Sequence, residues 1–255
     1  MIERWLEHER RHRGQRALVR QLQYQEEKSR SVNGFVQHYI AEMQGHSRSV
    51  RSRLEQFHPI GTEARVLEVG SGAHGLIFYF DALRRVGVDP LARHYASLFP
   101  GWQSQAPTVA AVGNALPFPD ASFDVVLCDN VVDHAEDPKG IVVEVARVLA
   151  PNGYLYFTVN VHHRLYSVAA FLHRAWNAAG IRFEMGPFAD HTVHLTPVQA
   201  RRLFDGVPMS VISETADIEA VRASARQTSP RHPGDLLKRV FFKNAAFEVV
   251  ARRSS

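Results

Sequence analysis

Short apolar, β-branched runs alternate with longer stretches of helical character along most of the chain. Five such runs are Arg65–Val69, Arg85–Val88, Val109–Val112, Val125–Cys128 and Tyr154–Val159. Continuous apolar runs are typical of strands buried on both faces, and their alternation with helices indicates a parallel sheet. Two last runs, Val207–Ser213 and Ala245–Arg252, predict an antiparallel pair. The pattern predicts an α/β fold, a Rossmann-like, mostly parallel seven-stranded sheet with helices on both faces.

Two segments fall outside this alternation. Residues 1–60 are rich in Arg, Glu, Gln and His with spaced apolar positions, and His58-Pro59 ends them, because the residue before a proline disfavours the α conformation. An aromatic, His-rich stretch fills about 160–196, after which Thr196-Pro197 opens a helix. We predict an N-terminal helical arm or lid over 1–60 and a catalytic domain over 61–255 with a cap insertion at about 160–196.

Composition narrows the class of protein. The chain has 255 residues, 45% of them hydrophobic, which is enough for one substantial core. No run of about 18 apolar residues appears and the N-terminus is charged, so we expect a soluble, cytoplasmic protein. Cys128 is the only cysteine, which excludes an internal disulfide and a cysteine-rich zinc site.

The net charge of +4 equals the excess of 11 Lys and Arg over 7 Asp and Glu within residues 1–60. A basic helical arm can contact an anionic membrane face or nucleic acid, although a solvated helix surface is the commoner explanation. Peripheral membrane contact therefore stays open as an alternative.

The clearest local motif is a buried strand that runs into a glycine-rich turn at Gly70 and Gly72. Such a turn lets a cofactor approach the backbone, but alone it also suits a dinucleotide. Glu68, two residues before Gly70, would repel a pyrophosphate and favours a cationic sulfonium cofactor. Asp89 ends the second strand, where a carboxylate can bind both ribose hydroxyls of either cofactor.

Four further motifs follow in order: Gly113–Asp120, Ser122–Val126, Val131–Pro138 and Arg147–Gly153. With them, residues 66–159 resemble the class I S-adenosylmethionine-dependent methyltransferases, in particular the small-molecule, type 11-like branch. The resemblance implies S-adenosyl-L-methionine as the cofactor and a Rossmann-like methyltransferase domain over 61–255.

The resemblance also implies which residues bind the cofactor. Glu68 and the turn would hold the methionine part, Asp89 the ribose, and Pro90 and Leu91 the adenine. Asn114 stands where the family usually has an Asp, and His74 where many members have a third glycine. The implied set is Glu68, Gly70, Ser71, Gly72, Asp89, Pro90, Leu91, Asn114, Ala115, Leu116, Asp129 and Asn130.

Transfer of a methyl group to a hydroxyl benefits from a general base. His134 follows the fourth strand, and His191 and His194 precede the helix that closes the cap, so each is a candidate, with a structural role as the alternative. The scattered spacing of the histidines lacks the register of helical zinc sites, so we expect no metal.

The expected acceptor is a small molecule or a glycan or lipid-linked precursor, methylated on oxygen. The cap supplies aromatic and basic residues that suit such an acceptor: Phe171, Trp176, Phe183, Phe188, Arg164, Arg174 and Arg182. Nucleobase methylation is disfavoured because Asp129-Asn130-Val131-Val132 replaces the Asn/Asp-Pro-Pro-aromatic tetrad. A nicotinamide reductase is disfavoured because no Tyr-x-x-x-Lys follows. N-methylation of a small amine and a catalytically silent methyltransferase-like binding protein remain alternatives, and the oligomeric state is unknown.

Overall fold

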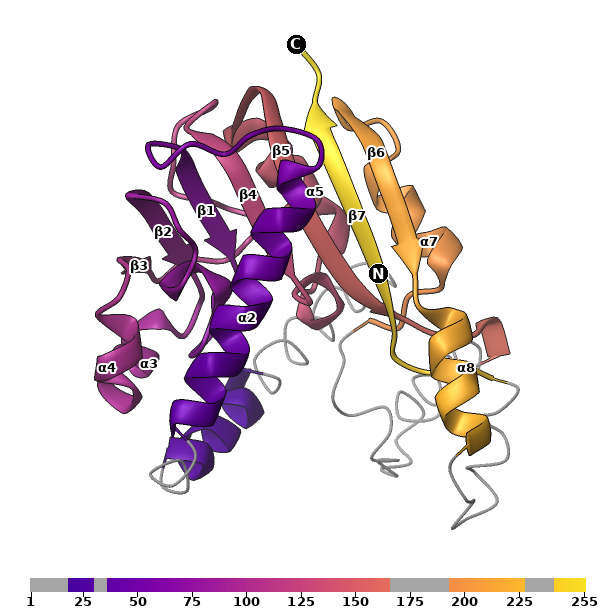
Figure 1. Cartoon of the computed structure of the whole chain (residues 1–255), viewed down its shortest axis with the longest axis horizontal. Helices are drawn as coiled ribbons and strands as arrows, with labels where there is room; N and C mark the ends of the chain where they lie inside the picture. The colour runs from indigo at the N-terminus through magenta and orange to yellow at the C-terminus, as the bar shows by residue number, and fades with distance from the viewer. Residues whose placement is uncertain (1–17, 30–35, 166–192, 228–240) are drawn as a thin grey trace, which may run out of the picture.

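The computed structural model describes residues 18–29, 36–165, 193–227 and 241–255 (Figure 1). Its strands form one seven-stranded sheet in the order β3-β2-β1-β4-β5-β7-β6. The strands are β1 (Arg65–Val69), β2 (Arg84–Val88), β3 (Thr108–Val109), β4 (Phe123–Asp129), β5 (Leu149–Val161), β6 (Met209–Ala216) and β7 (Ala245–Arg253). The helices are α2 (Val36–Glu55), η2 (Leu76–Phe78), α3 (Ala92–Leu98), α4 (Pro100–Gln103), η3 (Val132–His134), α5 (Pro138–Val148), α7 (Pro197–Arg201), η5 (Arg202–Phe204) and α8 (Ile218–Gln227), and residues 18–29 are also helical.

The sheet is parallel from β3 to β5, and β7 then lies antiparallel between β5 and β6. Strand order reverses at β1, which pairs with β2 on one side and β4 on the other. In open parallel sheets ligands bind outside the carboxyl ends of the strands at such a switch point. The predicted fold class is confirmed, including the closing antiparallel pair.

Several strands differ in length from the runs that predicted them, and β3 and β5 illustrate the reasons. β3 is two residues long and ends at Val109, because the chain turns away from the sheet, and Val112 is exposed with its carbonyl accepting from Ala115 N. β5 is longer than its apolar run because its pairing with β4 begins at Leu149 and its pairing with β7 continues to Val161. Edge position and pairing length depend on the neighbouring strands, which the local pattern does not contain.

Alternate side chains of the central strands enter two separate cores, one on each face of the sheet. In β4, Val126 and Cys128 pack with α5 residues such as Val142, whereas Val125 and Leu127 pack on the face that α2 covers. Burial on both faces explains the continuous apolar run. Figure 1 shows α2 running along the front of the sheet.

The helix α2 contributes to the core and also reaches the loops that follow β1 and β2. Val50 and Leu54 are buried in the cluster on its face of the sheet. Tyr39 and Ile40, near its start, pack against an apolar cluster whose members are Ala73, Leu91, Tyr95, Phe99 and Trp102, together with Leu22 from helix 18–29. Whether residues 1–60 act as a lid stays a prediction.

Most of the predicted cap, 166–192, lies outside the described residues. The described residues that follow it are anchored to the sheet, because Leu195 bridges to Val161 and Leu195 O accepts from His162 N at 2.8 Å. Thr196 caps α7 through a capping box with Gln199, as the Thr-Pro pair predicts.

Leu54 offers a test of how far α2 belongs to the fold. Its side chain is 1% exposed, so Leu54→Ala should lower the free energy of unfolding by about 2–5 kcal/mol through lost burial and a residual cavity. Urea denaturation measures this change. Leu83→Ala is the control, because Leu83 is 75% exposed and should change stability by less than about 0.5 kcal/mol. Equal, small effects of both substitutions would show that α2 is not packed on the sheet.

Candidate cofactor and acceptor site

The turn after β1 is fixed to the end of β2 by its backbone. Gly70 N and Ser71 N both donate to Val88 O, at 2.7 and 3.0 Å. Gly70 has φ of +73°, and a Cβ built there would lie 2.4 Å from Val131 Cγ2. Only glycine fits this backbone at this distance from the β4 loop, which explains the first glycine of the motif.

The buried side chain of Glu68 stabilises the same turn through hydrogen bonds. Its side chain is 2% exposed, and its two carboxyl oxygens accept hydrogen bonds from Leu76 N at 3.1 Å and Ile77 N at 2.9 Å. A Cβ at Gly75 would lie 2.3 Å from Glu68 Oε2, so the chain passes close over this carboxyl group. Burial raises the pKa of Glu68 to about 8, against the lowering effect of the two backbone N–H groups. The structure thus assigns Glu68 a role in holding the loop, and its contact with the cofactor stays a prediction.

Asp89 joins the turn to the segment after β2. Its Oδ2 accepts from Gly72 N at 3.0 Å and its Oδ1 from Leu91 N at 2.8 Å. Burial raises the pKa of Asp89, and these two hydrogen bonds oppose the shift. Each oxygen accepts one N–H and keeps a further lone pair, so the carboxylate fits the pair of hydroxyls on a ribose.

The predicted adenine side has an apolar wall. Leu91 is buried, whereas Pro90 is exposed. His74 does not disturb the turn as a bulky third residue would, because its ring packs edge-on against Phe99 and Trp102, with centroids 4.5 and 4.3 Å away. Burial, together with the nearby charge of Lys28, lowers the pKa of His74 to about 4, so the ring is neutral at physiological pH.

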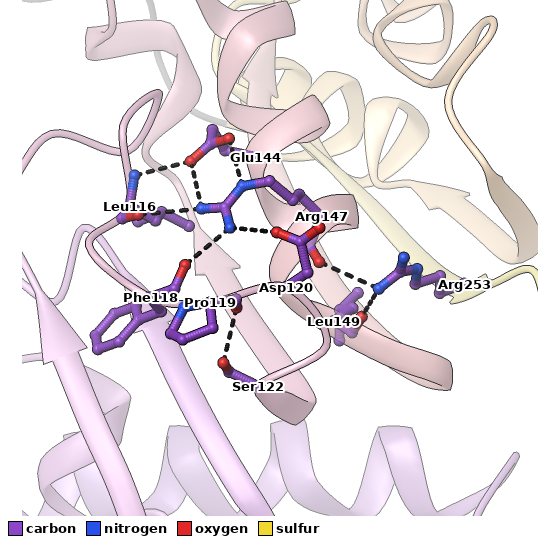
Figure 2. Close-up of polar contacts among 9 residues, drawn as sticks. All are labelled: Leu116, Phe118, Pro119, Asp120, Ser122, Glu144, Arg147, Leu149 and Arg253. Carbon is purple, nitrogen blue, oxygen red and sulfur yellow. Dashed lines mark hydrogen bonds and ion pairs between the residues drawn. The ribbon is translucent and has the colours of Figure 1, made fainter.

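The loop that carries Asn114 and Ala115 is held by a partly exposed polar network (Figure 2). Glu144 Oε2 accepts from Leu116 N at 2.9 Å, and Arg147 donates to Leu116 O at 3.1 Å and Phe118 O at 2.8 Å. Arg147 also pairs with Glu144 and with Asp120, both at 2.8 Å. The sequence motif contains Arg147, but its role as the anchor of this loop appears only in the structure.

The carboxyl end of β4 carries a polar cluster. Asp129 Oδ2 lies 2.9 Å from Nε2 of His46 on α2, and Asp129 Oδ1 accepts from the Thr158 hydroxyl. Asn130 has φ of +55°, and its Oδ1 accepts from Asn160 Nδ2 at 2.6 Å. Asp129 and Asn130 therefore lie at the carboxyl ends of the strands, where ligands bind in such sheets. His46 also lies there, although no local sequence motif indicates it.

The three histidines predicted as bases have different surroundings. His134 ends η3 with its side chain 44% exposed and its Nε2 3.7 Å from Asp133 Oδ1. His194 is 9% exposed and its ring lies against His162, with centroids 5.1 Å apart. His191 lies outside the described residues. A catalytic role for any of them stays a prediction.

Within 18–29, 36–165, 193–227 and 241–255, no group of three or more His, Cys, Asp or Glu side chains could hold a metal ion. In the same part of the chain no helix is both long and apolar enough to span a bilayer.

Comparison with known proteins identifies the domain. Residues 67–157 match the family described as a methyltransferase domain. A relative from Mycobacterium sp. (strain JLS), named an uncharacterized methyltransferase, is 32% identical over 133 residues, which cover 51% of this chain and 44% of that protein. The chain thus spans about half the length of the curated relatives it matches.

Solved structures share the fold. The Bacillus subtilis YcgJ protein has a TM-score of 0.58 at 16% identity, covering 82% of this chain and 99% of that one. Geranyl diphosphate C-methyltransferase from Streptomyces coelicolor, solved with S-adenosyl-L-homocysteine, has a TM-score of 0.59 at 13% identity, covering 85% of this chain and 82% of that one.

The family match and the fold define the class of the domain: residues 67–157 match methyltransferase domains, and the fold is shared with solved methyltransferases. The Streptomyces coelicolor structure holds S-adenosyl-L-homocysteine, the demethylated form of S-adenosylmethionine, which is the cofactor expected for a methyltransferase domain. The donor set described above fits it, because Asp89 keeps lone pairs for the ribose and the turn at Gly70 and Gly72 presents backbone without side chains.

The buried carboxyl group of Glu68 generates a stability prediction for the cofactor-free protein. In Glu68→Gln an amide nitrogen faces one of the two backbone N–H donors, so the free energy of unfolding should fall by about 1–3 kcal/mol. The folded pKa of about 8 lies above the ordinary 4.5, so the wild-type contribution is fully present below 4.5 and is lost as pH rises through 8.

The measured difference between wild type and Glu68→Gln should therefore shrink with rising pH across this window, in urea titrations at several pH values. The exposed Glu63→Gln is the control and should show less than about 0.5 kcal/mol at every pH. A Glu68→Gln difference that is flat or grows with pH would contradict the assigned pKa direction.

Proposed function

We propose that the protein transfers a methyl group from S-adenosylmethionine to a hydroxyl group of a small molecule or of a glycan or lipid-linked precursor. The observation that carries this proposal is the pair of half-exposed imidazoles, His46 and His134, at the carboxyl end of β4. An alcohol or phenol must lose its proton during methylation, and imidazole is the side chain suited to accept it near neutral pH.

In this proposal, the chain's own residues divide the work. Asp89 binds the ribose hydroxyls, Gly70 to Gly72 give backbone contacts, and the loop held by Arg147 lies against the adenine. The sulfonium cofactor supplies an already activated methyl group. Alignment of the acceptor with that group can contribute about 7–11 kcal/mol, so the enzyme's main task is positioning together with proton removal.

Asp89 gives a direct test of the cofactor site. Asp89→Ala should weaken the binding of S-adenosylhomocysteine about tenfold to over a hundredfold, because a charge-assisted hydrogen bond is worth about 1.5–3 kcal/mol. Isothermal titration calorimetry measures the dissociation constant. Glu219→Ala is the control, since Glu219 is exposed on α8 and its carboxylate pairs only with Arg222 in the described structure. An unchanged dissociation constant in Asp89→Ala would show that the ribose lies elsewhere.

The acceptor class is tested by incubating the protein and S-adenosylmethionine with pools of hydroxyl compounds and, separately, of small amines. Mass spectrometry should find the mass of one added methylene on a hydroxyl compound, with an equal amount of S-adenosylhomocysteine released. Products confined to the amine pool would replace O-methylation by N-methylation. Cofactor binding without turnover in any pool would indicate a binding protein.

A further inference from the structure

His46 brings an imidazole from the N-terminal segment to the edge of the sheet where the acceptor is expected. It lies in α2, nine residues before the end of that helix at Glu55, and α2 passes the carboxyl end of β4 (Figure 1). Nε2 of His46 is 2.9 Å from Oδ2 of Asp129, the last residue of β4. The pair therefore joins two residues that are 83 positions apart in the sequence, at the carboxyl ends of the strands near the point where strand order reverses.

The carboxylate of Asp129 is held in place by the sheet rather than by the histidine. Its other oxygen accepts from the hydroxyl of Thr158 on β5, and Thr158 in turn fixes the next backbone N–H, that of Asn130, at 2.9 Å. A carboxylate fixed in this way orients the imidazole that it binds, as in other histidine–carboxylate pairs. With Nε2 directed at Asp129, Nδ1 is the nitrogen left for another partner, and it has none among the described residues.

The position of α2 does not depend on this pair. Val50 and Leu54 are buried beneath the helix, and Ser47 donates its hydroxyl hydrogen to Leu76 O. Further along, Arg53 binds Glu248 at 2.8 Å. These contacts fix the helix on the sheet, whereas the side chain of His46 is 42% exposed and an exposed ion pair contributes little to stability.

We propose that His46 is the general base of the methyl transfer and that Asp129 is its positioning residue. This inference rests on the proposed function. The bond between the acceptor oxygen and the methyl carbon forms while the bond between that carbon and the sulfonium sulfur breaks, and the sulfur keeps the electron pair. The proton of the acceptor hydroxyl passes to Nδ1 of His46 and then to water.

Three acidic groups face His46 from the strands packed against α2: Asp129 on β4, Glu68 on β1 and Glu248 on β7. The hydrogen bond to Asp129 raises the pKa of His46 above 6.5 and partial burial opposes it. The negative charges of Asp129 and Glu248 raise this pKa further, as does Glu68 where it is ionised. Only the neutral imidazole accepts a proton. Turnover should therefore rise with pH through the pKa of His46, at a pH above the ordinary 6.5.

The first experiment measures the pKa of His46 in the absence of any acceptor. NMR titration of the histidine ring signals in the cofactor-free protein, assigned with His46→Gln, should give a pKa above 6.5 for His46. Asp129→Asn should lower this pKa, because the amide keeps the shape of the side chain but removes its charge. His94 on α3 is exposed, and its ring signals serve as the internal control.

The second experiment measures release of S-adenosylhomocysteine against pH with the hydroxyl pool that supports turnover. His46→Gln should lower kcat about 10²–10⁴-fold and remove the limb of the profile assigned to His46, while calorimetry shows unchanged binding of S-adenosylhomocysteine. His94→Gln should leave the profile unchanged. In Asp129→Asn the limb should move to lower pH by the same amount as the pKa measured by NMR.

Several results would overturn the proposal. One is a pH–turnover profile in which the rising limb persists in His46→Gln. Another is a limb that disappears in His134→Gln instead. A third is loss of S-adenosylhomocysteine binding in His46→Gln with kcat preserved, which would make His46 a cofactor contact. If His46→Gln unfolds, the comparison of Asp129→Asn in the two experiments decides, and a limb that does not follow the NMR pKa refutes the role. Absence of turnover in the wild type refutes the proposed function itself, whereas turnover with a persistent limb refutes only the base.

Discussion

The geometry of the site depends on one buried group, the carboxyl of Glu68. Placing an ionisable side chain inside a core is costly unless its oxygens find donors, and here Leu76 N and Ile77 N supply them. These two bonds tie β1 to η2 and force the chain to turn over the carboxyl group at Gly75. The turn then presents Gly72 N to Asp89, so the two predicted ends of the cofactor site are set by an acid that the cofactor need not touch.

A second constraint comes from α2, which links the N-terminal segment to both the core and the site. Its later residues, Val50 and Leu54, pack on the central strands, and its earlier residues, Tyr39 and Ile40, pack beside the predicted adenine wall. His46 lies between these two groups along the helix. A segment whose composition suggests a polar arm therefore supplies both an apolar stripe and the imidazole proposed as the base, from one amphipathic helix.

The sequence predicts those features that are specified by residues close together along the chain. The strand β1, the turn at Gly70 and the acid at Asp89 are each specified by neighbours within a few residues, and the structure places them as expected. The pair of His46 and Asp129 was missed, because it joins positions 83 residues apart and no spacing rule connects them. Likewise the partly buried, neutral ring of His74 reflects Phe99, which lies between α3 and α4, and Trp102 on α4. For His191 the local pattern alone supports a role.

The charges at the carboxyl end of β4 are set by few groups. Glu68, with its pKa raised to about 8, is mostly protonated at neutral pH, and Glu248 is paired with Arg53. The net charge at this place therefore depends mainly on Asp129 and His46. When His46 is protonated, the pair of His46 and Asp129 is nearly neutral. When His46 loses its proton, the pair carries the negative charge of Asp129. Deprotonation of His46 therefore has two effects in the same direction: it frees a nitrogen that can accept the acceptor's proton, and it leaves a carboxylate whose field favours the positive charge of a sulfonium.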